Sequence, residues 1–294
     1  MGKAYSLCFL CISIWSLNYI ARQILLTVYP PFFLSAFSLT VVSVLFILVA
    51  FWRKAFVKVT GRQLWLLLVT AFIGLIANQI FLYTGLKRTT ATNASLIFTL
   101  APLMTAGLAA LFLKEKITWR MMIGSVIALI GLFGALGVTG VRVSAGDLYI
   151  VGAVFTFACN MILVRLLSAT MTPFMITAYS FLLSAIVFDP FVLGMVRVDW
   201  SHSLRMWGFA FISVIVAQGL ASVLWNKGME TIGAARSAIM LNLQPIMTML
   251  LDFTVFDHPI RVQQVFGAAL VLIGVFIATS QKEQLNNEHF AKSH

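Results

Sequence analysis

The sequence is poor in charged residues. Only 10% of its 294 residues are Asp, Glu, Lys or Arg, whereas 61% are hydrophobic, and the mean hydropathy is +1.00. A water-soluble domain must keep a largely polar surface, so this composition excludes a soluble protein. The formal net charge is +11, but the basic residues lie in short clusters between apolar runs. That distribution argues against a nucleic-acid-binding face, and no nucleic-acid partner is expected.

Sequence motifs of enzymes and ATP-driven pumps are missing as well. Neither the Walker A pattern G-x-x-x-x-G-K-S/T nor the hydrolase patterns H-E-x-x-H and G-x-S-x-G occur. The histidines all fall in expected loops or in the C-terminal tail: His202, His258, His289 and His294. We therefore expect neither an enzyme nor an ATPase, and no cofactor.

Cysteine is scarce too. Cys8, Cys11 and Cys159 lie inside apolar segments, where thiols usually behave as small hydrophobic side chains. Cys8 and Cys11 form a C-x-x-C pair, but no second pair follows it. We therefore predict neither a disulfide framework nor a metal site.

Long apolar runs dominate what is present. A helix needs roughly 20 apolar residues to cross a hydrocarbon core about 30 Å thick, so each such run predicts a transmembrane helix. The first run continues without a signal-peptide cleavage site and is read as a retained helix. We expect an all-α membrane protein with ten transmembrane helices, at 4–21, 32–52, 64–86, 91–113, 118–137, 147–167, 173–196, 205–226, 234–256 and 262–280.

The connections between these runs predict the orientation. If the N-terminus is cytoplasmic, the cytoplasmic loops and tail carry twelve Lys and Arg residues and the opposite loops carry six. Because positive residues concentrate on the cytoplasmic side, both termini are expected to be cytoplasmic.

The chain repeats itself after 143 residues. Under this shift Pro102 falls on Pro245, and five glycine or aliphatic positions fall on identical residues, from Gly85 on Gly228 to Gly131 on Gly274. A fainter match places Asn18 near Asn160. A unit of five helices is odd in number, so its copy must enter the membrane in the opposite direction. We expect two inverted five-helix repeats, at 4–137 and 147–280, and a cytoplasmic tail at 281–294.

Three blocks carry a family resemblance. They are the W-S-x-N-Y stretch of the first helix, the segment from Gly85 to Pro102 with its L-K-E-K-I-T continuation, and the segment from Leu224 to Pro245 with the later Gly267 to Gly274 helix. In these blocks the chain resembles the EamA-type ten-helix members of the drug/metabolite transporter superfamily. It departs from them at Asp257-His258, where the second half would usually repeat a Glu, so any role of that Glu is in doubt here.

The resemblance implies a multi-pass transporter of the bacterial inner membrane. Such a protein exports a small metabolite, for example an amino acid or an amino-acid-derived compound, by alternating access through a cavity between its halves. A multidrug or toxic-compound exporter, a metallophore exporter and a passive facilitator remain alternatives. The expected partners are the small-molecule substrate, the lipid bilayer and a coupling proton.

Polar side chains inside the predicted helices are the candidate site, because they are costly in hydrocarbon unless they are used or paired. Amides both donate and accept hydrogen bonds, which suits a polar or zwitterionic solute. Hydrogen bonds that merely tie helices together are the alternative explanation. The candidate substrate-binding residues are Asn18, Asn78, Gln79, Tyr83, Asn160, Tyr179, Gln218, Trp225, Asn226, Asn242 and Gln244.

Two prolines and one carboxylate complete the candidates. Pro102 and Pro245 occupy equivalent positions in two helices, where each predicts a kink that could serve as a hinge or only as packing. Asp252 stands where the first half has Ala109. It could carry a coupling proton or bind a substrate amine, unless it pairs with an arginine or lies near the outer rim. Arg22 is expected to end the first helix and reach the interface.

Glycines spaced by seven residues lie on one face of each repeat's last helix. Gly124 and Gly131 form one pair, and Gly267 and Gly274 the other. Such faces allow close contact between helices. The contact could form within one chain or between two copies, so a monomer and a homodimer are both compatible with the sequence.

Overall fold

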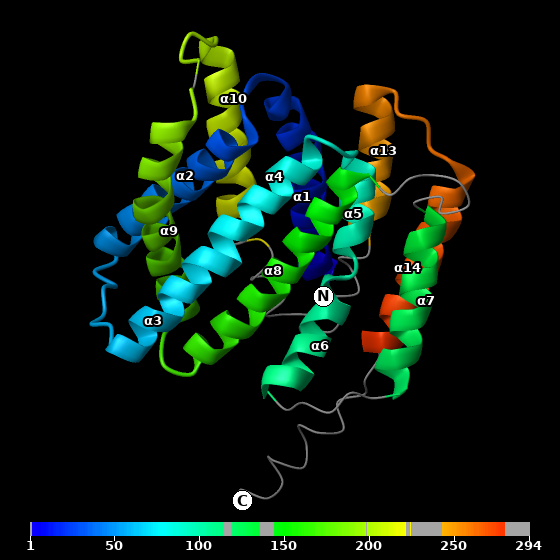
Figure 1. The fold of residues 1–294 in the computed structure, drawn as a ribbon, viewed down its shortest axis with the longest axis horizontal. Coiled ribbons are helices and arrows are strands. Elements are labelled where there is room, and N and C mark those ends of the chain that lie inside the picture. Colours follow the sequence, from blue (N-terminus) through cyan, green and yellow to red (C-terminus); the bar gives the residue numbers. More distant parts are fainter. Residues whose placement is uncertain are drawn as a thin grey trace, which may run out of the picture.

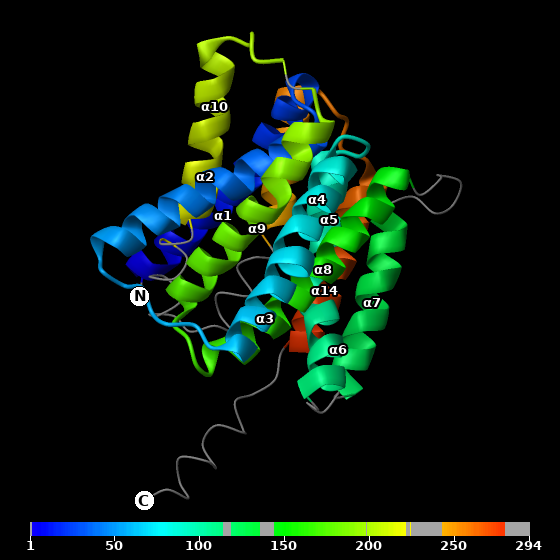
Figure 2. The same cartoon turned by 60° about the vertical axis from the view of Figure 1, so that its left-hand side comes forward.

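The computed structural model describes residues 2–113, 119–135, 144–197, 199–221, 224 and 243–279. The regular structure in these ranges is entirely helical (Figures 1 and 2). Its elements are α1 (Gly2–Val28), α2 (Pro31–Trp52), α3 (Gly61–Val69), η1 (Thr70–Ala77), α4 (Asn78–Leu86), α5 (Ala91–Phe98), α6 (Ala101–Leu113), α7 (Trp119–Ala135), α8 (Ala145–Ser168), α9 (Pro173–Met195), α10 (Leu204–Val214), η2 (Ile215–Leu220), α13 (Gln244–Phe256) and α14 (Val262–Thr279).

Six helical stretches are long and apolar enough to cross a membrane: Ala4–Val28, Pro31–Trp52, Gly61–Leu86, Ala91–Phe112, Ala145–Ser168 and Phe174–Met195. Shorter apolar helices occupy Met122–Ala135, Leu204–Leu220, Gln244–Phe256 and Val262–Gly274. Each of the ten runs expected from the sequence coincides with one of these stretches. Six full-length spans are therefore found, and a count of ten spans stays a prediction.

Large apolar side chains cover the outside of the bundle. Leu48 is 63% exposed, Phe112 66% and Phe266 69%. In water such a surface would drive association, but in a bilayer it faces lipid at no cost. Polar backbone groups are paired inside each helix, which is what a span requires.

The glycine faces bring α7 and α14 into direct contact, and the two helices lie side by side in both views (Figures 1 and 2). A Cβ atom on Gly131 would lie 2.6 Å from the Val271 nitrogen, and one on Gly267 would lie 2.5 Å from the Gly131 carbonyl oxygen. The backbones approach this closely only because the side chains are missing. The glycine contact is thus made within one chain, and this face is occupied rather than open to a second copy.

Two of the helices contain a π-helical stretch. The helix from Gly61 to Leu86 is π-helical at Thr70–Ala77, and the stretch Ile215–Leu220 follows α10 in the same way. Under the shift of 143 residues, 72–77 falls on 215–220. Trp15 Nε1 donates to the Ala217 carbonyl oxygen at 3.0 Å, so one π segment also anchors α1. Such stretches are rare and frequently mark functional positions.

A two-residue turn at Thr99 and Leu100 interrupts the helical stretch Ala91–Phe112. α5 ends at Phe98 and α6 begins at Ala101. Just before the break, the Ser95 hydroxyl donates to the Thr92 carbonyl at 2.8 Å and the Thr99 hydroxyl to the Leu96 carbonyl at 2.6 Å. Such bonds compete with the helical ladder. Pro102 is then the second residue of α6, where a missing N–H costs nothing, and Pro245 is likewise the second residue of α13.

Candidate functional site

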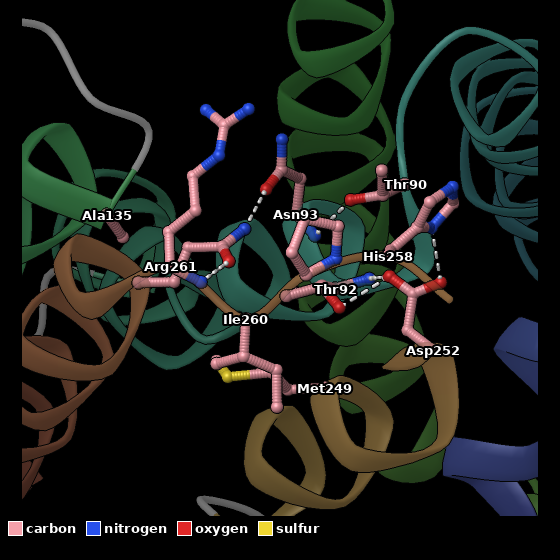
Figure 3. A pocket seen from close by; sticks show the side chains of 11 residues that line it. Thr90, Thr92, Asn93, Ala135, Met249, Asp252, His258, Ile260 and Arg261 are labelled. Carbon is pink, nitrogen blue, oxygen red and sulfur yellow. Dashed lines mark hydrogen bonds and ion pairs between the residues drawn. The ribbon is translucent and has the colours of Figure 1, made fainter. Parts of the chain in front are cut away.

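A polar cavity of about 180 Å³ lies where α5 begins, α13 ends and α14 begins (Figure 3). The apolar side chains of Met249 and Ile260 form part of its wall. Its other side chains are mostly polar, which is unusual beside a membrane-spanning bundle. The polar lining residues are Thr90, Thr92, Asn93, Asp252, His258, Arg261 and Gln264.

Asp252 is the buried charge of this cavity, with only 1% of its surface exposed. Its Oδ2 atom accepts hydrogen bonds from the Thr92 hydroxyl at 2.6 Å and from the Thr92 backbone N–H at 3.3 Å. That N–H belongs to the first turn of α5, where backbone donors lack helical partners and where a negative charge is favoured by the helix dipole. Asp252 therefore joins the end of α13 to the start of α5.

His258 supplies the third contact to Asp252. Its Nδ1 atom lies 3.0 Å from Asp252 Oδ1, although the two residues are six apart in the chain. The approach is possible because Asp257, with φ of 55°, adopts the left-handed conformation and turns the chain back over the helix end. The His258 ring stacks on Phe256 at 5.6 Å. Since its side chain is 44% exposed, His258 connects the buried carboxylate to solvent.

A second set of hydrogen bonds ties α14 and α8 to α5. Gln264 Nε2 donates to Asn93 Oδ1 at 3.4 Å, and Asn93 Nδ2 donates to the Thr89 hydroxyl at 3.5 Å. That hydroxyl donates to Asp147 Oδ1 at 2.5 Å, on the first turn of α8. Arg261 lines the cavity, but its guanidinium points away from Asp252 (Figure 3). The first turn of α5 is consequently a junction for α8, α13 and α14.

The arrangement places a carboxylate beside an imidazole. In the ranges that the structure describes, no group of three His, Cys, Asp or Glu side chains could hold a metal ion. The Asp252 carboxyl group accepts two hydrogen bonds from Thr92, and His258 Nδ1 lies at hydrogen-bond distance from its other oxygen. Adding a proton to the carboxylate weakens each of these contacts.

The amides expected at the site lie elsewhere, and Asn78 ties helices together. Its Nδ2 atom donates to the Ala153 carbonyl oxygen at 2.7 Å and to the Thr156 hydroxyl at 3.2 Å, which joins α4 to α8. Tyr83, also expected at the site, hydrogen-bonds through its hydroxyl to the Ser38 hydroxyl at 2.6 Å. Both side chains are buried and hydrogen-bonded to the protein.

Two other amides keep unused acceptors. Gln79 is 7% exposed, and its Oε1 atom is buried without a hydrogen-bond partner among the described residues. Asn160 Oδ1 is likewise buried and unpaired within the same part of the chain. Asn160 packs against Gly74, where a Cβ atom would lie 2.8 Å from Asn160 Cγ. Both unused acceptors thus border the π-helical segment η1.

The remaining candidates are scattered. Asn18 is half-buried on α1 and makes no hydrogen bond with any residue that the structure describes. Tyr179 donates to the Val57 carbonyl oxygen at 2.8 Å and so fixes the connection between α2 and α3. Gln218 lies in η2, and Gln244 begins α13. Trp225, Asn226 and Asn242 lie outside the described residues.

Arg22 does not end its helix, contrary to the expectation. α1 continues to Val28, and four of the six residues after Arg22 are apolar. The Arg22 guanidinium lies 5.0 Å above the ring of Tyr83, where the face of the ring stabilises the positive charge. The charge therefore lies within the span rather than at its end.

The structure separates the two sequence-based alternatives for Asp252. Its partners among the described residues are Thr92 and His258, not an arginine. It lies near the end of α13, which finishes at Phe256, and this place agrees with the alternative of a position near the rim. Thr92 was missed as a site residue. The available signal was the T-T-A-T sequence at 89–92, a run of hydroxyls typical of a helix start, with Thr90 as the N-cap of α5.

Comparison with models of known protein families identifies the family of this chain. The model of the EamA-like transporter family matches residues 2–137 and, a second time, residues 144–280. The chain belongs to this family. It is an EamA-like transporter of the drug/metabolite type, and its apolar helices make it a multi-pass membrane protein.

Curated relatives of this EamA-like transporter are mostly named as transporters without a substrate. The chain is 32% identical to the uncharacterized transporter YyaM of Bacillus subtilis (strain 168) over 221 residues, which cover 72% of each chain. It is 26% identical to the uncharacterized transporter YetK of the same organism, covering 87% of this chain and 80% of YetK. It is also 23% identical to a probable amino-acid metabolite efflux pump of Salmonella typhimurium, covering 92% and 93%.

A solved structure shares the fold of this EamA-like transporter. A protein crystal structure superposes with a TM-score of 0.65 at 20% identity, covering 95% of this chain and 97% of the other. The match extends over nearly the whole of both chains. The fold is therefore one already seen in a crystal.

Proposed function

We propose that this EamA-like transporter is a secondary carrier of the bacterial inner membrane that exports a small metabolite, such as an amino acid or an amino-acid-derived compound, by alternating access. The name of the Salmonella relative supports an amino-acid metabolite as the class of solute. The unpaired acceptors of Gln79 and Asn160 support it as well, because each can accept a hydrogen bond from a solute N–H.

The contact between Asp252 and Thr92 is the observation that carries the mechanism. Thr92 belongs to the first proposed repeat and Asp252 to the second, and their hydrogen bonds hold the two together at one end of the bundle. In the proposed orientation, with both termini cytoplasmic, this end faces outward. Protonation of Asp252 through His258 loosens the contact and favours opening to the outside. Asp252 is therefore our candidate for proton coupling.

The proposed repeats, residues 4–137 and 147–280, have support from three sources. The family model matches twice, once on each half. The π-helical stretches fall at equivalent positions, and each of Pro102 and Pro245 is the second residue of a helix that starts within a predicted span. Backbone that is already irregular at these points can change conformation at low cost, so we propose both proline positions as hinges.

Counterflow in proteoliposomes tests the proposal. Metabolites that accumulate in a deletion strain identify the solutes to try. Vesicles that contain the purified protein and an excess of unlabelled solute should accumulate labelled solute transiently, because a carrier exchanges one molecule for another. A steady leak without trans-stimulation would instead favour a passive facilitator and contradict alternating access. A panel of toxic cations and metallophores distinguishes the remaining alternatives.

A further inference from the structure

A long apolar groove lies on the side of the molecule away from the α7–α14 pair. It has a volume of about 650 Å³ and runs between α2, α9 and α10, which neighbour one another in both views (Figures 1 and 2). Small-molecule sites in proteins usually measure about 300–1,000 Å³. The groove is thus large enough for a ligand, and it shares no lining residue with the polar cavity around Asp252.

One face of α2 forms the floor of this groove. Phe33, Phe37, Thr40, Val44 and Leu48 line it at helical spacing. With a rise of about 1.5 Å per residue, the stripe from Phe33 to Leu48 is about 22 Å long. It is aromatic before Thr40 and aliphatic after it. The two ends of the groove therefore favour different parts of a ligand.

The aromatic end is a cluster of rings in mutual contact. Phe37 and Phe211 lie 4.8 Å apart between ring centroids, Trp200 and Trp207 stack at 5.6 Å, and Phe33 lies 5.8 Å from Trp207. All five rings line the groove. The face of an aromatic ring is electron-rich and attracts organic cations.

Asp189 lies beside Thr40, where the groove changes from aromatic to aliphatic. Its Oδ2 atom is 2.6 Å from the Thr40 hydroxyl. Its Oδ1 atom is buried and has no hydrogen-bond partner among the described residues. Asp189 is also the one charged residue in the described lining of the groove. A carboxylate within a membrane span is costly without a counter-charge, and a bound cation would supply it.

We propose that this groove binds an amphiphilic organic cation that enters from the bilayer. The ammonium head lies between the Asp189 carboxylate and the aromatic rings, and the alkyl chain follows Val44 and Leu48. These two side chains are 53% and 63% exposed on the apolar surface of the bundle, so the aliphatic end is open toward lipid. A neutral chain would leave the carboxylate uncompensated, and an anion would be repelled. The inference does not depend on the metabolite that the carrier exports.

Binding of radiolabelled dodecyltrimethylammonium to the full-length protein in phosphatidylglycerol nanodiscs tests the proposal. Empty nanodiscs give the background of partitioning into lipid. We expect saturable binding to the protein, and a loss of affinity of about tenfold or more in Asp189→Asn, because the substitution removes the charge but keeps the shape. Trp207→Leu should weaken binding as well. Dodecanol, which lacks the charge, should compete poorly.

The matched control is Asp257→Asn, which removes a carboxylate from an exposed loop, outside the groove, at a left-handed residue that Asn tolerates. Its affinity should equal that of the unaltered protein. Equal binding by Asp189→Asn, or equally strong competition by dodecanol, would overturn the proposal. Loss of binding when phosphatidylethanolamine is added would also overturn it, because the occupant would then be a lipid headgroup. Circular dichroism and gel filtration confirm that each variant folds.

Discussion

His258 Nδ1 lies 3.0 Å from Asp252 Oδ1, and these residues stand at two positions where the halves of the chain differ in charge. Asp252 replaces Ala109, and His258 replaces Glu115, under the shift of 143 residues. The two differences are thus one feature: the second half carries an acid and a base that contact each other. Their pairing joins a buried carboxylate to an imidazole whose side chain is 44% exposed.

Asp252→Asn should abolish the pH dependence of transport while the protein still folds. Asn keeps the shape of the side chain and can still accept a hydrogen bond from Thr92, but it cannot exchange a proton. The measurement is the initial rate of solute exchange in proteoliposomes over external pH values from about 5 to 8. An unchanged pH profile would remove Asp252 from the coupling mechanism without affecting the assignment as a carrier.

His258→Ala should weaken the pH response without abolishing it. The substitution removes the exposed group that relays the proton, whereas the contacts between Asp252 and Thr92 remain. The same exchange assay measures the effect, and Asp257→Asn in the same loop serves as the control with an unaltered profile. An effect of His258→Ala as large as that of Asp252→Asn would mean that the imidazole, rather than the carboxylate, holds the functional proton.

Gly131→Ala should destabilise the protein by about 1–3 kcal/mol through overpacking. The new Cβ atom would lie 2.6 Å from the Val271 backbone nitrogen and 2.7 Å from Leu270 Cβ, so α7 and α14 must separate. Thermal unfolding of the purified protein measures the change. Gly134→Ala on the same helix is the control, because a Cβ atom there meets nothing within 4 Å. Equal melting temperatures for the two variants would show that the close contact is not formed.

Asn78→Ala should lower stability by about 1–2 kcal/mol, because it removes both hydrogen bonds that join α4 to α8. Asn18→Ala makes the same change to a half-buried side chain that has no hydrogen bond in the described part of the chain. Only the first variant should melt at a lower temperature. A larger loss in Asn18→Ala would indicate that Asn18, not Asn78, holds helices together.

Sequence reasoning found the helices more readily than the contacts between them. Composition and apolar runs suffice for the spans, because a bilayer demands long apolar helices. The ends were less predictable: Arg22 was expected to end the first helix, but six more residues extend it to Val28. The break before Pro102 depends on side-chain hydroxyl groups that donate hydrogen bonds to backbone carbonyls and so compete with the backbone N–H groups of the helix. Such local competition leaves no periodic signal in the sequence.

The candidate site could be predicted only in part. Asp252 and His258 both stood out as differences between the halves, but their contact depends on one left-handed residue, Asp257, that sequence patterns do not reveal. The amides were identified as polar residues inside spans, yet helix rotation decides whether each one pairs with protein, as Asn78 does, or keeps an unused acceptor, as Gln79 does. Sequence fixes that rotation only loosely when a helix is apolar all round.

The glycine contact between α7 and α14 has a mechanical consequence for the proposed carrier. The helices belong to different halves, and their backbones touch at Gly131 and Gly267 with no flexible side chain between them. Two helices in such close backbone contact cannot slide far past each other without a steric clash, although they can tilt about the contact point. We therefore expect this contact to be the fulcrum, so that distances across it stay constant while the ends of α5 and α13 swing apart.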